Sequence, residues 1–344
     1  MVGILASLCL ACVELIDGKG PLDDPSPRGS LWVYAPNSKS PFTEVELQDY
    51  PEHLDFHPLG LDVFPGSSTK DHSHMLVVNH GRDNSTIEQF LLSPVAPYRA
   101  TYVRTLTSPH FVSPNAVAFA SASTLYVTQD HRFTRRLPGL FGKILPMIET
   151  LLLPGIAWVN HVDIHSDGRL NVTYAARGIS FANGIAVSGD GARVAVASSS
   201  QGAIHLYSRA RGDKLIWEEM VPVPFSPDNI RFEDGGILVV AGHPNFLALS
   251  AVATQKTQEA PSWIVSITPR IKPLTPTSSK EEDLAPRPAY KRMPISLSHE
   301  VKTLYQSNGS GFSTSSSGLW DEHSKAFYAV GLFQEGILTC KSSQ

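Results

Sequence analysis

Three short segments of this 344-residue chain place an asparagine or aspartate just ahead of an apolar run. Amide and carboxylate oxygens gathered in one place form an all-oxygen site, which suits a hard cation such as Ca²⁺. One such residue commonly just caps a turn before a strand, but recurrence in three segments favours a cation site. The segments are Ser113-Pro-Asn-Ala-Val117, Phe181-Ala-Asn-Gly-Ile185 and Ser226-Pro-Asp-Asn-Ile230, and His57-Pro-Leu-Gly-Leu61 has the same form with leucine in the polar place.

The elements that must position these residues are short strands. Turn signals such as Ser188-Gly-Asp-Gly191 separate runs rich in β-formers. One stretch, Thr134–Leu153, has helical periodicity, and Pro146 is expected to kink or interrupt it. The chain is therefore predicted to be all-β with one embedded helix at 134–153. The β-rich runs are Met75–Val78, Thr124–Thr128, Arg193–Ala197, Ala203–Tyr207, Ile237–Ala241 and Lys325–Gly331.

The spacing of the repeated segments predicts a β-propeller. Once the embedded helix is discounted, the repeat is about 50 residues long, the length of a multi-stranded blade, which gives six blades. Residues just ahead of the first strand of each blade then converge on the central axis. We expect one propeller domain over residues 14–344, interrupted by a polar loop at 268–296. The residues expected to share the axial site are Asn115, Asn183, Asp228 and Asn229.

Composition and charge exclude some functions and favour a compartment. Charged residues make up 17% of the chain, the net charge is −4, and no basic run is present, which argues against a nucleic-acid partner. The apolar segment 1–13 is too short to span a membrane and resembles a secretion signal or anchor. A secretory or extracellular protein could carry glycans at three sequons, which begin at Asn84, Asn171 and Asn308.

The three cysteines are Cys9, Cys12 and Cys340. No further cysteine or histidine set accompanies Cys9 and Cys12, so a zinc site is not expected. One cysteine near each end of the chain could tie the ends of a closed structure together. Unpaired thiols are the alternative.

Five further motifs, taken together, identify a family resemblance. In order and approximate spacing they resemble the serum paraoxonase/arylesterase family from about Phe56 to Cys340. The resemblance implies a six-bladed propeller with calcium in its central tunnel that hydrolyses lactones and aryl esters. It also implies that the four axial residues bind the catalytic calcium and that Cys12 and Cys340 form a disulfide. The motifs are Val77-Val-Asn-His80, Thr128-Gln-Asp-His-Arg-Phe133, Phe181-Ala-Asn-Gly184, Asp228-Asn-Ile230 and Gly242-His-Pro244.

The resemblance also assigns histidines. A calcium ion would polarise the ester carbonyl while a neighbouring imidazole takes a proton from the attacking water. His80 matches one histidine of the family's catalytic pair, whereas the other falls at Leu59 in this chain. His57 is the candidate substitute for that missing histidine. His131 and His243 match positions near the tunnel and are candidates for the substrate pocket.

Two departures from the family pattern bear on calcium. Ala116 follows Asn115 where the family has an acidic residue, so a second calcium held partly by the Leu61 carbonyl loses a carboxylate. We therefore expect one calcium ion. Asp23 is the candidate for the remaining carboxylate ligand, and the first blade is expected to be short because a strand follows Asp24 almost at once.

Three functions remain open at this stage. The first is a calcium-dependent hydrolase of small-molecule esters or lactones. The second is a degenerate propeller that binds partners without turnover, which Leu59, Ala116 and the short first blade favour. The third is a gluconolactonase-like propeller hydrolase. A serine hydrolase lacks its GxSxG motif here, and lipid or membrane contact is expected through the N-terminal run or the 134–153 helix.

Overall fold

The computed structural model describes residues 28–36, 38–152, 155–271, 296–322 and 324–341, and for residues 3–7 the backbone alone. Within these ranges, consecutive antiparallel strands form successive sheets, the blade pattern of a β-propeller. The chain divides into two compact units, Met1–Gly178 and Ile179–Gln344, which are described in turn. Cys12, Asp23, and most of the expected N-terminal segment and of the polar loop lie outside the described residues.

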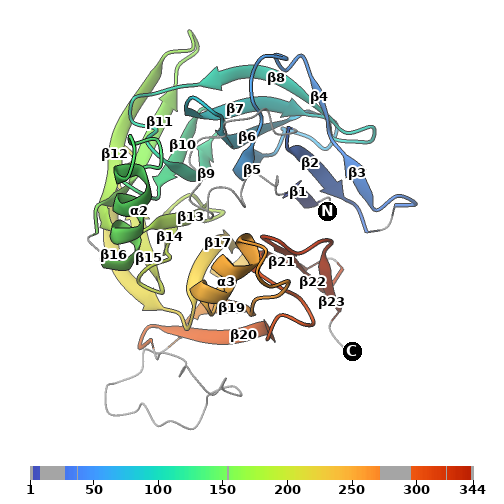
Figure 1. The fold of residues 1–344 in the computed structure, drawn as a ribbon. Coiled ribbons are helices and arrows are strands. Elements are labelled where there is room, and N and C mark those ends of the chain that lie inside the picture. The colour runs from blue at the N-terminus through green and yellow to red at the C-terminus, as the bar shows by residue number, and fades with distance from the viewer. Residues whose placement is uncertain are drawn as a thin grey trace. The chain divides into compact units, whose positions relative to one another are not determined.

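The first unit contains three sheets (Figure 1). The N-terminal sheet has the order β1 (Gly3–Ser7), β2 (Ser30–Tyr34), β3 (Phe42–Glu44). The next has the order β4 (Glu46–Gln48), β8 (Arg99–Leu106), β7 (Ser85–Leu92), β6 (Ser73–His80), β5 (Pro58–Phe64). The third runs in sequence through β9 (Pro114–Ser121), β10 (Thr124–Gln129), β11 (Ala157–Ile164) and β12 (Leu170–Ile179).

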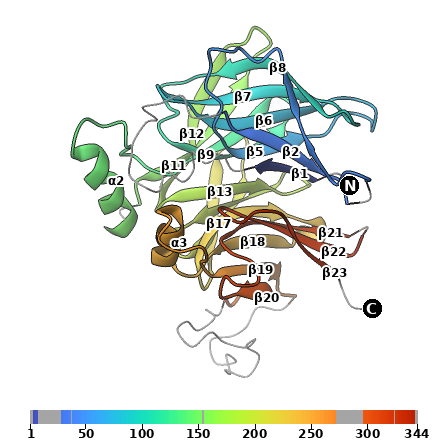
Figure 2. The same ribbon diagram turned by 45° about the vertical axis from the view of Figure 1, so that its right-hand side comes forward.

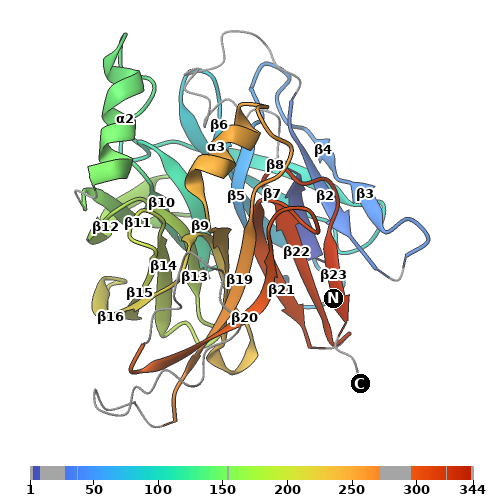
Figure 3. The same ribbon diagram turned by 60° about the horizontal axis from the view of Figure 1, so that its bottom comes forward.

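The second unit also contains three sheets, each in sequence order (Figure 3). The first holds β13 (Ala182–Val187), β14 (Arg193–Ser198), β15 (Ala203–Arg209) and β16 (Leu215–Pro222). The second holds β17 (Ser226–Phe232), β18 (Leu238–His243), β19 (Ser262–Pro269) and β20 (His299–Ser307), with a 3₁₀ turn at Asp234–Gly236 and helix α3 (Phe246–Ala253) between its strands. The third holds β21 (Ser315–Asp321), β22 (Ala326–Gly331) and β23 (Leu338–Lys341).

The expected number of six blades is wrong, because the described residues form five. We count as blades the sheets that begin at β5, β9, β13, β17 and β21. The N-terminal sheet is incomplete, with strands of five, five and three residues. The chain leaves it after β3, and β4 pairs in parallel with β8 of the neighbouring sheet, Glu46 opposite Arg99. The segment that would extend the first sheet therefore extends the second one instead.

The core of each unit lies between facing sheets. In the first unit, buried side chains of β6 and β7 pack against those of β9 and β10, including Leu76, Ile87, Val117 and Leu125. The second strand of a blade is covered on both faces, so β18 is buried at every position and its sequence is continuously apolar up to Gly242. Burial of each such leucine, isoleucine or valine stabilises the fold by roughly 1.5 to 3 kcal/mol.

The embedded helix is shorter than expected. Helix α2 spans Phe141–Leu152 and stands out from the β9–β12 sheet, in the connection from β10 to β11 (Figure 2). Pro146 lies inside this helix and does not interrupt it, contrary to expectation. A proline removes one backbone hydrogen bond from a helix, and here contacts of the polar face of α2, described below, hold the helix in place. No helix in the described ranges is long and apolar enough to cross a membrane.

Two glycines let the first strands of successive blades approach closely. A Cβ atom on Gly60 of β5 would lie 2.4 Å from the Asn115 carbonyl oxygen of β9. A Cβ atom on Gly184 of β13 would lie 2.5 Å from the Asp228 carbonyl oxygen of β17. Because real Cβ atoms do not approach other atoms this closely, glycine is required where each strand passes the polar residue of the next blade.

We expect Gly184→Ala to lower the free energy of unfolding by about 1 to 3 kcal/mol, because the added methyl group would push β13 away from β17. Urea denaturation measures this change. Gly189→Ala is the matched control, since a Cβ atom there meets nothing within 4 Å, and it should change stability by less than about 0.5 kcal/mol. Equal stability of the two variants would contradict the close approach.

Candidate functional site

The polar residues singled out by sequence occupy one structural position that recurs in four blades. In each blade the residue before this position faces the second strand: Pro58 opposite Asn79, Pro114 opposite Gln129, Ala182 opposite Ser198 and Pro227 opposite Gly242. The next residue of each first strand has its own neighbour. Side-chain hydrogen bonds join Asn115 to Asp130, Asn183 to Ser199 and Asp228 to His243, whereas Leu59 packs against the apolar cluster of the first unit.

In the first unit, the pair Asn115 and Asp130 is joined by a hydrogen bond. Asn115 Nδ2 donates to Asp130 Oδ2 over 3.2 Å. The other carboxylate oxygen of Asp130 lies 3.0 Å from Nδ1 of His131. Asn115 Oδ1 accepts no hydrogen bond from the described residues, so the amide is held by its donor side and keeps an oxygen available for a ligand.

His131 and Asp130 form an enclosed ion pair. Burial alone would raise the pKa of Asp130, but the charge of His131 and hydrogen bonds from His131 and Ser113 outweigh burial and hold that pKa below its ordinary value. Burial would lower the pKa of His131, and the charge of Asp130, aided by Glu149, raises it instead. The Asp130 carboxylate therefore favours the protonated form of His131, and the contact holds Asp130 in place.

His80, at the end of β6, has the opposite electrostatic state. Its Nε2 atom lies 2.6 Å from the Pro114 carbonyl oxygen, which can only accept, so Nε2 carries the proton. Burial lowers the pKa of His80, although the hydrogen bond to Pro114 and the charge of Asp130 act in the other direction. His80 is thus a neutral imidazole whose buried Nδ1 has no hydrogen-bond partner among the described residues. An unprotonated, unpaired ring nitrogen can accept a proton.

A buried polar network lies directly beside His80. The Asn79 side chain accepts a hydrogen bond from His57 N over 2.7 Å and donates to Glu88 Oε1 over 3.1 Å. Thr86 and Thr105 also donate to the Glu88 carboxylate, each over 2.6 Å. His80 N in turn donates to His57 O over 3.1 Å. The backbone of His57, the candidate second histidine, is therefore fixed next to His80.

In the second unit, Asn183 shows the same one-sided attachment as Asn115. Asn183 Nδ2 donates to Ser199 Oγ over 3.0 Å, and Ser199 Oγ donates to the Pro227 carbonyl over 2.5 Å. Asn183 Oδ1 is buried and has no partner among the described residues. A buried carbonyl oxygen without a partner is costly, so this atom is where a bound ligand would be most stabilising.

The adjacent residues Asp228 and Asn229 complete the polar set of the second unit. Asp228 is buried, and its Oδ2 atom lies 3.2 Å from His243 Nε2, which leaves Oδ1 without a hydrogen bond from the described residues. Asn229 Nδ2 donates to Ser316 Oγ over 3.1 Å. As at Asn183, the amide nitrogen of Asn229 makes a hydrogen bond and the amide oxygen is left for a ligand. This donor set is made of oxygen and fits a hard cation better than zinc.

The other predicted site residues have mixed outcomes. Leu61 lies in β5 opposite Val77. Ala116 offers no side-chain ligand, and its backbone N–H and C=O are both bonded to Thr128 Oγ1. Cys340 lies in β23 and forms no disulfide among the described residues, and its expected partner Cys12 lies outside them, so the pairing stays a prediction. Asp23 lies outside the described residues.

Asp130 and Ser199 were given no role from the sequence. Each follows the second strand of its blade and accepts a hydrogen bond from the asparagine of the first strand. A polar residue recurs at the end of the second β-rich run of a blade, and this pattern could have revealed both residues. The distance in sequence between the two runs varies with the length of the turn that joins them, which differs between blades. Strand register therefore had to be known first.

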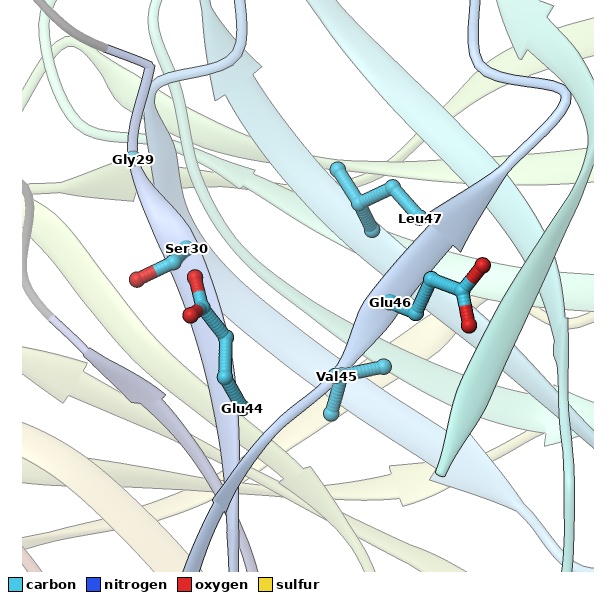
Figure 4. Close-up of a pocket in the computed structure, with 6 residues that line it drawn as sticks. All are labelled: Gly29, Ser30, Glu44, Val45, Glu46 and Leu47. Carbon is cyan, nitrogen blue, oxygen red and sulfur yellow. The ribbon is translucent and has the colours of Figure 1, made fainter. Parts of the chain in front are cut away.

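A pocket among the described residues lies elsewhere, at the incomplete first sheet (Figure 4). It has a volume of about 380 Å³ and contains none of the predicted site residues. The carboxylate of Glu46, on its rim, is paired with Arg99 over 3.0 Å. None of its residues matches a motif of the family, so we do not assign chemistry to it. Its lining residues are Gly29, Ser30, Glu44, Val45, Glu46 and Leu47.

Propeller blades with oxygen donors at the start of their first strands define the class of protein, and comparison with known proteins defines the family. The family model described as Arylesterase matches residues 24–280, and the chain belongs to this family. The resemblance found in the sequence motifs is thereby confirmed.

Named relatives agree with this family. Serum paraoxonase/arylesterase 1 of Mus musculus is 30% identical over 227 residues, covering 64% of this chain and 59% of the relative. Serum paraoxonase/lactonase 3 of Oryctolagus cuniculus is 27% identical over 228 residues, covering 65% and 60%. The chain thus spans about three fifths of the length of these curated relatives. Among solved structures, a periplasmic gluconolactonase of Pseudomonas aeruginosa has a TM-score of 0.47 at 10% identity, over 91% of this chain and 73% of that one.

The two histidines of the first unit should titrate on opposite sides of the ordinary histidine pKa of about 6.5. In calcium-free protein, histidine-selective NMR at pH 6.5 should show His80 neutral with the proton on Nε2 and His131 doubly protonated. As the pH rises, His131 loses its proton; as the pH falls, His80 gains one. The variants His80→Gln and His131→Gln assign the signals. A His80 ring that is charged at pH 6.5 would contradict its role as a neutral acceptor.

Proposed function

We propose that this chain is a calcium-dependent hydrolase of lactones and aryl esters. The observation that most directly supports this proposal is the buried Asn183 Oδ1 atom. It has no hydrogen-bond partner among the described residues, whereas Asn183 Nδ2 donates a hydrogen bond to Ser199. Asn115 and Asn229 repeat this attachment, each with its donor side bonded to a neighbour. Names of the relatives include arylesterase and lactonase, which supports the substrate class.

The residues that would hold one calcium ion are Asn115, Asn183, Asp228 and Asn229, with Asp23 as a further carboxylate. When bound, Ca²⁺ polarises the carbonyl of the substrate and stabilises negative charge on its oxygen. His243 and Ser199 would keep the Asp228 and Asn183 side chains in position. A second calcium with a Leu61 carbonyl contact is not part of the proposal, because Ala116 supplies no carboxylate.

His80 is the proposed general base. Its Nε2 proton is held by the Pro114 carbonyl, so its Nδ1 lone pair would accept a proton from the attacking water. Leu59 stands where the family resemblance expects the second histidine, and a leucine cannot share the proton. His57 lies next to His80 through the backbone contact and is the proposed assisting histidine. His131, as a cation bound to Asp130, is assigned to positioning, and His243 stays a candidate for the substrate pocket.

A second candidate function is a calcium-binding scaffold without turnover. Leu59 favours it, because an apolar residue replaces the histidine that the family resemblance expects there, and so does the incomplete first sheet. The hydrolysis experiment below separates the two functions, because both require calcium binding but only the hydrolase requires turnover.

We expect hydrolysis of phenyl acetate and of a medium-chain lactone in excess calcium, and loss of turnover after chelation. Asn183→Ala should weaken calcium affinity by about tenfold or more and lower hydrolysis with it, because the unpaired oxygen is removed. Exposed Asn171→Ala is the control and should behave like the wild type. Calorimetric calcium titration and initial rates give both quantities. A folded protein that binds calcium without turnover would be the scaffold.

We also propose that helix α2 contacts a phospholipid surface. Its large apolar side chains face solvent: Phe141 is 66%, Leu151 is 65% and Leu152 is 72% exposed. Lys143 of the same helix is exposed, and the helix has one acidic residue, the buried Glu149. An apolar face beside a positive charge suits an anionic lipid surface.

The double variant Leu151→Gln/Leu152→Gln should bind vesicles of phosphatidylserine and phosphatidylcholine at least about tenfold more weakly than the wild type, since two large apolar groups no longer enter the lipid. Vesicle co-sedimentation measures this binding. Val95→Gln, at a residue that is 65% exposed and lies outside α2, is the matched control. Unchanged binding of the double variant would remove α2 as the lipid contact.

Residence in the secretory pathway is part of the proposal. The relatives carry the word serum in their names. Asn84, Asn171 and Asn308, the three sequon asparagines, are all exposed. Glycans could be attached there without unfolding, so a mass shift on glycosidase treatment of protein from a eukaryotic host would support this compartment.

A further inference from the structure

Helix α2 is attached to the first unit by polar contacts, in the reverse of the usual amphipathic arrangement. Its buried residues are Gly142 and Glu149, whereas Phe141, Met147, Ile148, Leu151 and Leu152 are exposed. A surface helix ordinarily buries an apolar stripe and exposes its polar face. The hydrophobic effect therefore contributes little to holding α2 against the sheet, and the polar contacts must specify its position.

The first polar contact fixes the backbone that follows His131. The Glu149 carboxylate accepts hydrogen bonds from Arg132 N over 2.8 Å and from Phe133 N over 3.0 Å. Glu149 is 6% exposed, so these charge-assisted hydrogen bonds form away from solvent. Within the part of the chain that the structure describes, Glu149 is the acceptor for both N–H groups.

The second polar contact reaches the His131 ring. The hydroxyl of Thr150 donates its single proton to the Pro146 carbonyl over 2.9 Å. Its oxygen must therefore accept from His131 Nε2, which lies 2.8 Å away. The other ring nitrogen, Nδ1, faces Asp130 Oδ1 over 3.0 Å. The ring is held at both nitrogens, by the helix on one side and by the carboxylate on the other.

Asp130 carries this arrangement to the first strand of the blade. Its second oxygen accepts a hydrogen bond from Asn115 Nδ2 over 3.2 Å. This bond fixes the orientation of the Asn115 amide and leaves Oδ1 for a ligand. Thr150, His131, Asp130 and Asn115 thus form one uninterrupted series of hydrogen bonds. A rotation of the Asn115 amide would break the last of them.

We propose that Thr150 and Glu149 of α2 are positioning residues of the calcium site, holding His131 and Asp130 so that Asn115 presents its amide oxygen to the ion. This inference rests on the proposed calcium site, but it does not require turnover. Neither residue is expected to touch calcium or substrate. The embedded helix is accordingly part of the site's support, and its attachment sets the affinity for calcium.

Calcium affinity of purified full-length variants tests this inference. Thr150→Val removes the hydroxyl at nearly constant volume, and Thr150→Ser restores it. Thr254→Val is the matched control, because the Thr254 hydroxyl also donates to the carbonyl four residues earlier, Ser250 O, over 2.9 Å. Glu149→Gln provides a second, independent variant. Calorimetry gives the calcium dissociation constant, and thermal unfolding in chelator reports whether each variant is folded.

Thr150→Val should raise the calcium dissociation constant by about tenfold, in the range known for residues that orient metal ligands. Thr150→Ser and Thr254→Val should match the wild type, and Glu149→Gln should weaken calcium binding in the same direction as Thr150→Val. The kcat at saturating calcium should change by less than about threefold in Thr150→Val, because the loaded site contains the same ligands.

If Thr150→Val folds, three results would overturn the inference. One is an unchanged calcium affinity in folded Thr150→Val, and another is equal weakening by Thr254→Val, which would show a general loss of helix stability. The third is a wild type that binds no calcium, which would also end the proposed function. A wild type that binds calcium but hydrolyses neither substrate would contradict the proposed function alone, and the calcium affinities would still decide the role of Thr150. If Thr150→Val fails to fold, Glu149→Gln with normal affinity also overturns it.

Discussion

The hydrogen bond made by one side of an asparagine amide is the interaction on which the candidate site depends. An amide has a donor end and an acceptor end, and a cation can use only the acceptor. At Asn115, Asn183 and Asn229 a neighbouring polar residue occupies the donor end: Asp130, Ser199 and Ser316. The acceptor oxygens are thereby oriented before any ion arrives. Preorganisation of this kind reduces the cost of ordering ligands when the ion binds.

Close packing of successive first strands makes this orientation possible. Gly60 and Gly184 leave no side chain where the first strand of the next blade passes, so these neighbouring first strands lie in close contact. In the first unit the same contact delivers the Pro114 carbonyl to His80. In the second unit it delivers the Pro227 carbonyl to Ser199. His80 and Ser199 are thus equivalent in position, and side-chain chemistry alone separates a candidate base from a positioning hydroxyl.

Helix α2 combines two demands that usually conflict. Its inward face must be polar because it supports an ion pair and an amide, which leaves its apolar residues outward. An isolated exposed apolar face would be a liability, and contact with a lipid surface would cover it. One element could in this way hold the site and attach the protein to lipid. Pro146 is compatible with both roles, since its carbonyl takes the Thr150 hydroxyl.

The sequence by itself determined the fold class, the family and the identity of the polar residues. Short β-rich runs and the recurring Pro-Asn or Ala-Asn segments were sufficient, because propeller blades repeat locally and each repeat carries its own pattern. His80, Asn115, Asn183 and Asp228 could be named from type and place alone. The number of blades could not, because the strand pairing of β4 with β8 is a choice between two neighbouring sheets that periodicity does not reveal.

Only the tertiary structure decided which role each candidate site residue has. His80 and His131 are both histidines near the same strand ends, yet burial lowers the pKa of one and a carboxylate raises that of the other. The partners that decide this, Pro114, Asp130 and Thr150, are separated from the two rings by different lengths of chain, from 1 residue to 34. A hydrogen bond depends on distance and direction in space, and sequence spacing across turns of varying length fixes neither.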